Sequence, residues 1–364
     1  MKKKYRNAFF IFGLVLLGLM ITQLDFKQVW EGLSHAGYWF VAVLVLWFFL
    51  YFFNTTAWYI IIKSTAPLPN PSNSSLHEHR SSLRSASAGD VLEAKRINNA
   101  QQKIPYFWLY KIMVSGFALN YATPGGLMGG EPYRIMELSS YIGTERASSS
   151  VILHTMTHIF SHFWFWLLSV LIYVITEPLT PVMSAILAAV TIFCVMGIWF
   201  FMKGYKKGLA NRAFAFLSHI PGAKGWAKRF IDKHHDELDN IDKQIAALHK
   251  QNPRTFHGAL LLELACRFFS ALEIYFILLV IMPSANYMQC VLILAFTSLF
   301  ANMLFFMPLQ IGGREGGFMM STSGLALTSS AGIFVALIVR LRELFWTALG
   351  LLLINFGKKK ADSR

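Results

Sequence analysis

Long apolar runs limit what this chain can fold into more than any other feature of its sequence. Six of these runs are about 20 residues long or more, the length at which a helix crosses the hydrocarbon core of a bilayer. They cover residues 8–24, 38–62, 148–175, 181–202, 255–282 and 331–356. Only 14% of the residues are charged, which excludes an ordinary soluble enzyme.

Lysine and arginine outside these runs predict how the chain is oriented. The formal net charge is +14, and cytoplasmic loops of membrane proteins carry the excess of basic residues. The basic segments are therefore predicted to face the cytoplasm: residues 1–6, 63–103, 203–254 and 358–360. We expect a multi-pass protein of the cell (inner) membrane with both termini cytoplasmic. In so apolar a chain the charge indicates anionic lipid as the partner, and no nucleic acid is expected.

Two shorter apolar stretches, 106–123 and 287–308, each run into a cluster of glycines. The run 38–62 is predicted to end on the cytoplasmic side, and the run 148–175 must start on that side. The stretch 106–123 between them is therefore predicted to enter and leave the membrane by the cytoplasmic face. By the mirror argument the second stretch enters and leaves by the outer face. The sequence thus predicts an all-α polytopic membrane protein with six full transmembrane helices and two re-entrant helical hairpins.

This topology divides the chain into consecutive segments of three kinds. The full transmembrane helices are assigned to residues 1–63, 147–203, 255–286 and 331–357, with two helices in each of the first two segments. The hairpins are assigned to residues 106–146 on the cytoplasmic side and 287–330 on the outer side. Two polar segments remain. Residues 64–105 are rich in Ser, Asn and Pro and predict a disordered cytoplasmic insert, and residues 204–254 predict an amphipathic helical region.

Both hairpins contain the pattern Gly-Gly-x-x-Gly-Gly, which indicates an internal repeat. The first copy holds Gly125, Gly126, Gly129 and Gly130, and the second holds Gly312, Gly313, Gly316 and Gly317. Because the hairpins enter from opposite sides, the repeat is predicted to be inverted, an arrangement typical of transporters with broken helices. A structural alternative is that glycine-rich turns simply allow close helix packing.

Charged residues beside the glycines predict a site for a phosphate headgroup. Successive glycine amides can form a nest for an anion, and Pro132 suits the first turn of a helix whose N-terminal amides point back at them. Arg134 and Arg314 can grip a phosphate through two donors each. Glu131 and Glu315 can pair with these arginines or with an amine of the ligand. Charges inside a membrane are costly, so they tend to line cavities.

Three histidines share one face of a predicted membrane helix, because His154, His158 and His162 are four residues apart. Three interpretations stay open for them: a metal site, a proton relay, or a polar lining of the substrate cavity. His154 and His158 are therefore candidate substrate-binding residues.

Three charged residues lie within the run 255–282. Glu263 and Arg267 are four residues apart and are predicted to neutralise each other on their helix, with substrate binding as the alternative. Glu273 lies deeper without an obvious local partner, which makes it a weaker functional candidate.

On these motifs the sequence resembles the flippase-like, lysylphosphatidylglycerol synthase transmembrane family over roughly residues 8–356. The family carries an N-x-x-T-P-G-G-x-G-G-E-x-x-R type signature, then a P-G-G-x-G-x-x-E type turn, then an arginine before an aromatic pair. The matching positions are Asn120, Thr123, Pro124, Gly125, Gly126, Gly129, Gly130, Glu131 and Arg134, then Gly312, Gly313, Glu315, Gly316 and Gly317. For the last element, either Arg340 or Arg342 stands before Phe345-Trp346.

The resemblance implies the translocase part of the family alone, since the synthase domain of its bifunctional members has no counterpart in this chain. Movement of aminoacylated phospholipid across the membrane is attributed to that transmembrane part. The chain departs from the family by carrying His154 and His158 where an acidic residue and an arginine are common. Arg314 inside the second turn is also unusual. The substrate of this chain can therefore differ from the family's usual lipid.

We therefore expect a translocase that moves an anionic or aminoacylated phospholipid, or a polyprenyl-phosphate lipid, between leaflets. Its expected partners are membrane lipids with phosphate headgroups, and no cofactor is expected, since the chain has neither a GxxxxGK[ST] loop nor cysteines at zinc spacing. One alternative is an intramembrane lipid-headgroup transferase that uses a polyprenyl-linked donor. Another is a non-transporting membrane partner of a separate lipid-modifying enzyme.

Overall fold

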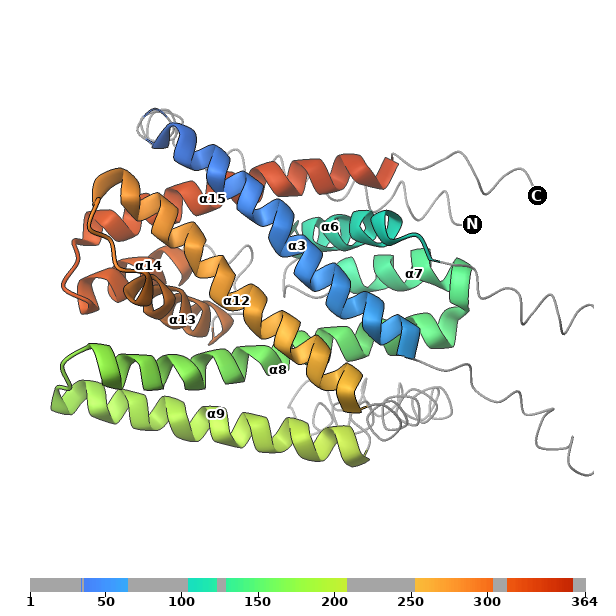
Figure 1. Ribbon diagram of the computed structural model, residues 1–364, viewed down its shortest axis with the longest axis horizontal. Coiled ribbons are helices and arrows are strands. Elements are labelled where there is room, and N and C mark those ends of the chain that lie inside the picture. Colours follow the sequence, from blue (N-terminus) through green and yellow to red (C-terminus); the bar gives the residue numbers. More distant parts are fainter. Residues whose placement is uncertain are drawn as a thin grey trace, which may run out of the picture.

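The computed structural model describes residues 34, 36–64, 104–122, 129–207, 253–303 and 313–355, which form helices joined by short turns (Figure 1). Within these residues the predicted all-helical character is confirmed. Several predicted segments lie outside them: the first membrane helix at 8–24, nearly all of the insert 64–105, and most of the amphipathic region 204–254.

Long apolar helices form the frame of the molecule. They are α3 (Tyr38–Ser64), α8 (Thr144–Thr176), α9 (Pro181–Lys207) and α12 (Pro253–Ile281). Within the described residues, four helices are long and apolar enough to cross a membrane, and they lie in these elements. α15 (Ser329–Asn355) is equally long, but Arg340, Arg342 and Glu343 lie in its middle. With these three charges α15 is not among the four, although the run 331–356 was predicted to be a full transmembrane helix.

Shorter helices occupy the two stretches that were predicted to be hairpins. α6 (Tyr106–Ala122) is followed by α7 (Gly130–Ile142), and α13 (Tyr287–Met303) is followed by α14 (Gly313–Gly324). A helix of 17 residues is only about 25 Å long, which is less than a hydrocarbon core of about 30 Å. In each pair the second helix starts at a glycine of the repeated pattern, Gly130 or Gly313.

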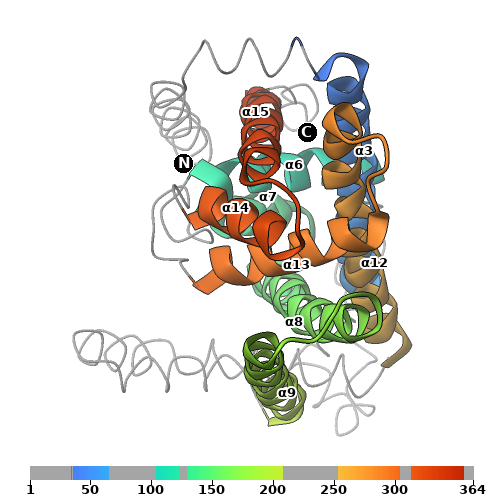
Figure 2. The same cartoon turned by 90° about the vertical axis from the view of Figure 1, so that its left-hand side faces the viewer.

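The helices of the two halves pack in matching ways. α3 packs against α12, α6 against α7 and α15, and α7 against α8. The corresponding contacts in the second half are α13 with α14 and α8, and α14 with α15. Exchanging α3 with α12, α6 with α13, α7 with α14 and α8 with α15 therefore leaves the pattern of neighbours unchanged. α9 lies outside this scheme and packs on α8 at the edge of the bundle (Figure 2).

The two short-helix pairs are connected to the long helices at opposite ends of the bundle. Figure 1 shows the turn between α7 and α8 at one end and the turn between α14 and α15 at the other. The first turn is made by Gly143, whose φ of +81° is in the region that favours glycine. α3 and α12 lie side by side and run in opposite directions.

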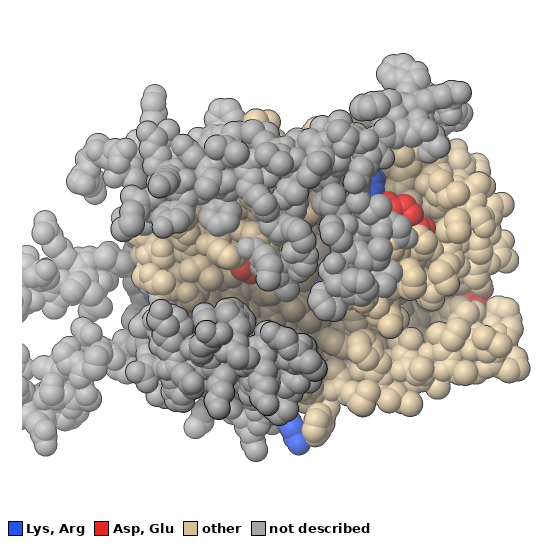
Figure 3. All heavy atoms as spheres, turned by 180° about the vertical axis from the view of Figure 1, so that it is seen from behind, with Lys and Arg blue, Asp and Glu red and all other residues tan. Residues whose placement is uncertain are grey.

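The outer surface of the described helices is apolar. On α9, for example, Val182, Ile192 and Trp199 are 72%, 61% and 58% exposed. Figure 3 shows few charged atoms among the described residues on one face of the molecule. Contiguous exposed apolar surface of this kind suits contact with lipid.

Candidate functional site

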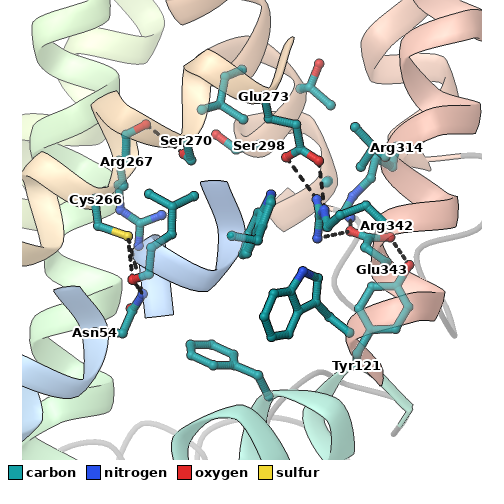
Figure 4. A pocket seen from close by; sticks show the side chains of 18 of the residues that line it. Asn54, Tyr121, Cys266, Arg267, Ser270, Glu273, Ser298, Arg314, Arg342 and Glu343 are labelled. Carbon is teal, nitrogen blue, oxygen red and sulfur yellow. Dashed lines mark hydrogen bonds and ion pairs between the residues drawn. The ribbon is translucent and has the colours of Figure 1, made fainter. Parts of the chain in front are cut away.

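A cavity of about 340 Å³ lies at the centre of the bundle, between the two matching halves (Figure 4). Its walls come from α3, α6 and α8 of the first half and from α12, α13, α14 and α15 of the second. Its charged and imidazole side chains are His158, His162, Glu263, Arg267, Glu273, Arg314, Arg342 and Glu343. Three arginines thus face three glutamates, and their formal charges cancel when the histidines are neutral.

One wall of the cavity is held by the ion pair between Arg342 of α15 and Glu273 of α12. Arg342 Nε donates to Glu273 Oε1 at 2.7 Å, and Nη2 donates to Oε2 at 3.0 Å. Both side chains are buried, and the guanidinium lies 3.8 Å from the centre of the Trp47 ring. Two parallel charge-assisted hydrogen bonds fix the angle as well as the distance, so this pair orients α15 against α12.

The neighbouring carboxylate of Glu343 joins both short-helix pairs to α15. Arg314, the second residue of α14, forms an ion pair with it, and Tyr121, near the end of α6, donates its hydroxyl hydrogen to it. Arg342 Nη1 lies 3.7 Å from the same carboxylate. Glu343 therefore lies where the broken ends of α6 and α14 meet, as Figure 4 shows.

A second link between α14 and α15 lies outside the cavity lining. Arg340 donates to Glu315, whose side chain is 39% exposed. Successive residues of α14, Arg314 and Glu315, therefore bind oppositely charged residues of α15. In one pair α14 provides the positive charge, and in the other it provides the negative charge. A shift of one helix along the other would bring like charges together, so the two pairs favour one register.

The residues of the first glycine motif hold α6 and α7 together. The Gly130 amide donates to Asn120 Oδ1 at 2.7 Å, and Asn120 Nδ2 donates to Glu131 Oε1 at 2.9 Å. Glu131 lies 3.6 Å from Arg134, which is 2% exposed and stands 4.7 Å from the centre of the Phe117 ring. Phe117 lines the cavity, and Arg134 lies behind it.

Close packing of α6 on α7 depends on two glycines. A Cβ atom on Gly116 would lie 2.3 Å from Arg134 Nε, and a Cβ atom on Gly130 would lie 2.1 Å from the carbonyl oxygen of Gly116. Real Cβ atoms do not approach other atoms so closely. The structural alternative for the glycine motif, close helix packing, therefore applies to Gly130.

At the other end of the cavity Glu263 of α12 faces two histidines of α8. Its Oε2 lies 2.7 Å from His158 Nδ1, and its Oε1 lies 3.2 Å from His154 Nε2. Arg267 donates from Nε to Ser161 Oγ at 2.7 Å and from Nη2 to the His158 carbonyl oxygen at 2.8 Å. Glu263 and Arg267 thus both bind α8. They form no direct ion pair with each other, and the electrostatic interaction between them acts at longer range.

The histidine stripe shows no metal site in the part of the chain that the structure describes. No group of three or more His, Cys, Asp or Glu side chains there is arranged to hold a metal ion. The three cysteines are free and buried, and Cys266 accepts a hydrogen bond from Asn54 at the cavity wall. His158 and His162 lie in the wall of the central cavity.

The structure divides the predicted site residues into groups. Those that line the cavity are His158, Arg314 and Arg342. His154 contacts the cavity-lining Glu263 from behind. Those at the contacts of α6 with α7 or of α14 with α15, away from the lining, are Asn120, Gly130, Glu131, Arg134, Glu315 and Arg340. Gly313 is the buried first residue of α14. Gly129 caps the start of α7. Thr123, Gly125, Gly126 and Gly312, with most of the proposed anion nest, lie outside the described residues.

Sequence reasoning missed Glu343 and Tyr121. The cluster Arg340, Arg342 and Glu343 in an apolar run was a usable signal for the first, because three charges in one membrane segment require partners. Tyr121 gave no signal, since a tyrosine in an apolar helix is common. Glu273, which lacked a local partner in sequence, is paired with Arg342.

Comparison with known proteins gives one match. A model of the family described as the lysylphosphatidylglycerol synthase TM region matches residues 8–350, a range that includes both glycine motifs and the charged segment of α15. No curated protein and no solved structure matches the chain. The match covers nearly every element that contributes to the central cavity.

Proposed function

Because this chain belongs to the lysylphosphatidylglycerol synthase TM region family, we propose that it is a lipid translocase. Family membership and the apolar helices indicate a membrane protein with a lipid-related function. The proposed substrate is an anionic or aminoacylated phospholipid, or a polyprenyl-phosphate lipid, that moves between leaflets without covalent chemistry. The proposed location is the cell (inner) membrane, with both termini in the cytoplasm.

The architecture supports a transport mechanism that alternates between the two sides of the membrane. We propose six full transmembrane helices and two re-entrant hairpins, α6–α7 and α13–α14, in inverted halves. The matching helix contacts and the opposite positions of the two hairpin connections support this arrangement. A site between two inverted halves can be exposed to either side by rocking one half against the other.

The observation that carries the proposal is the central cavity with its Arg–Glu pairs. Arg314 and Arg342 are held by Glu343 and Glu273, and each guanidinium has the fork of donors that matches a phosphate. A phosphate that enters can replace one carboxylate as the partner of an arginine, so that each guanidinium keeps a negatively charged partner with or without the phosphate. Such exchange lowers the cost of moving a charged headgroup through an apolar layer.

A second, apolar cavity supports an amphiphilic substrate. It measures about 240 Å³ and lies between α8, α9, α13 and α14, with a wall of residues such as Leu187, Phe296 and Met320. Trp166 lines this cavity and donates to Ser298, which lines the central one, at 2.9 Å. A charged and an apolar space thus adjoin each other across α13, which fits a headgroup and an acyl chain.

Reconstitution into liposomes tests the proposal. Vesicles of phosphatidylglycerol and phosphatidylcholine with a trace of fluorescent phosphatidylglycerol are treated with dithionite, which quenches the outer leaflet only. Protein is expected to make most of the fluorescence accessible, and Glu273→Gln is expected to slow this. Arg254→Ala, at the exposed start of α12, is the matched control and keeps the wild-type rate.

Each other outcome of that experiment contradicts the proposal. An inner-leaflet fraction that stays protected with wild-type protein rules out translocation of this lipid. Formation of a new lipid species, detected by mass spectrometry of the extracted lipids, supports the headgroup-transferase alternative.

A further inference from the structure

Glu263 of α12 is a buried carboxylate that lies between two histidines of α8, an arrangement that a polar cavity lining does not require. Glu263 is 1% exposed, and each of its oxygens faces an imidazole nitrogen, His158 Nδ1 at 2.7 Å and His154 Nε2 at 3.2 Å. His158 and Glu263 line the central cavity. A buried carboxylate between two titratable rings therefore lies at the surface of the proposed lipid path.

The protons in this cluster can be counted from its chemistry. Glu263 Oε2 and His158 Nδ1, which face each other at 2.7 Å, need a proton between them, because two lone pairs in that position repel. His154 Nε2 lies within ion-pair distance of Oε1 but makes no hydrogen bond to it. In the state with neutral histidines, His158 uses its one N–H toward Glu263, and the cluster of Glu263 with both rings carries one negative charge. The other nitrogen of either ring can take a further proton, which makes the cluster neutral.

Arg267 beside this cluster differs from the other arginines of the cavity. It hydrogen-bonds the uncharged oxygens of Ser161 and the His158 backbone. Among the described residues, no carboxylate lies within 4 Å of it, whereas Arg314 and Arg342 have Glu343 and Glu273. The charge of Arg267 is balanced at longer range by Glu263, four residues earlier on α12.

The charges at this end of the cavity therefore depend on one proton. Glu263 and Arg267 sum to zero when both histidines are neutral, and to one positive charge when the cluster has taken up a proton. An uncompensated buried charge is costly, and a phosphodiester monoanion compensates this one. We propose that a lipid phosphodiester and one proton bind together here, with Arg267 as the phosphate ligand and His154–Glu263–His158 as the proton-binding site.

The surrounding elements contribute few other groups that titrate or carry charge. Arg134 of α7 and Cys266 of α12 interact electrostatically with Glu263. His162 of α8 has its ring 5.5 Å from that of His158, and Tyr51 of α3 lines the same cavity. Within the described residues, Glu263 is thus the carboxylate that the two histidines share.

The inference rests on the proposed function, because it takes the translocated lipid to be the anion, and it adds that a proton accompanies this anion. Thermodynamic linkage then requires that anion binding tightens as pH falls, and by the same factor that the anion raises proton affinity. A coupling within the usual range predicts a dissociation constant that rises about tenfold from acidic to alkaline pH.

Calorimetry on the full-length protein in detergent micelles tests this coupling. Dihexanoyl phosphatidylglycerol is titrated in buffers of different ionisation enthalpy, and the dependence of the heat on the buffer gives the number of protons taken up. With a tenfold coupling, uptake is expected to peak at about half a proton per bound lipid midway through the affinity change, and to vanish at pH values well above or below it. Dimethyl phosphate, a free phosphodiester, is the second ligand, and weaker binding of it shows that the site takes the lipid form.

Two variants and one control distinguish a proton-binding role of the cluster from a purely structural role. Glu263→Gln removes the negative charge, so Arg267 is expected to bind the lipid without proton uptake and with little pH dependence. His154→Gln with His158→Gln is expected to lose the uptake as well. His257→Gln, at an exposed position on α12, is expected to keep the wild-type uptake.

The outcomes are decisive in either direction. Proton uptake in the wild type that disappears in Glu263→Gln supports the proposal, even if the double histidine variant does not fold. Lipid binding without uptake, uptake that persists in Glu263→Gln, or no lipid binding by the wild type overturns it. Failure of the proposed function would be seen in a different experiment, as the absence of lipid movement in liposomes. The two failures are therefore distinguishable.

Discussion

Arg342 of α15 and Glu273 of α12 form a two-point ion pair at the centre of the bundle, with hydrogen bonds of 2.7 and 3.0 Å. The pair joins elements that are 69 residues apart in sequence. Both side chains are buried, so each charge depends on the other for compensation. This mutual dependence leads to the first prediction.

Removal of one partner of this pair is expected to be far more costly than removal of both. Glu273→Gln or Arg342→Gln each leaves a buried charge, which destabilises a protein by about 3–5 kcal/mol. The double variant is expected to recover most of that loss. Thermal unfolding of the purified protein in detergent measures the effect, and losses that simply add would contradict it.

The exposed pair between Glu315 and Arg340 is expected to contribute less. Ion pairs that solvent or headgroups can reach contribute about 1 kcal/mol at most. Glu315→Arg and Arg340→Glu alone are therefore expected to lower the unfolding temperature slightly, and the two together are expected to restore it. If the exchanged pair is no more stable than the single variants, α14 and α15 are not held by this contact.

Gly130→Ala is expected to disrupt the packing of α6 on α7. The added methyl would lie 2.1 Å from the Gly116 carbonyl oxygen, and a backbone atom cannot move aside as a flexible side chain can. Overpacking of this kind costs about 1–3 kcal/mol. Gly324→Ala is the matched control, because a Cβ atom there has no neighbour within 4 Å. Equal unfolding temperatures for the two variants would contradict the prediction.

Tyr121→Phe is expected to slow transport while it preserves the fold. The variant removes only the hydroxyl group that donates to Glu343, and a hydrogen bond to a charged group contributes about 1.5–3 kcal/mol. A loss of this size corresponds to at least a tenfold lower rate of lipid movement in liposomes, if the bond forms in the rate-limiting state. Tyr141→Phe, near the end of α7 and outside the cavity lining, serves as the control. Equal rates in both variants would show that Tyr121 has no part in transport.

Part of the candidate site could be predicted from sequence. Arg314, Arg342 and His158 were recognisable, because charged or titratable residues in apolar segments are unfavourable without a partner or a cavity. Arg134 has the same sequence signature, yet it lies behind Phe117 and contacts Glu131. A motif can thus indicate that a residue needs a partner, but it does not tell whether that partner is a ligand or a neighbouring side chain.

Local patterns were enough to predict the helical character of the described residues and the family to which the chain belongs, because apolar runs and glycine motifs can be read over a few residues. The partners of the buried charges became evident only from the folded bundle. His158 and Glu263 are 105 residues apart, and Arg314 and Glu343 are 29 apart. Such pairings follow from which helices cross and at what angle. That crossing depends on the packing of the whole bundle, which no local pattern records.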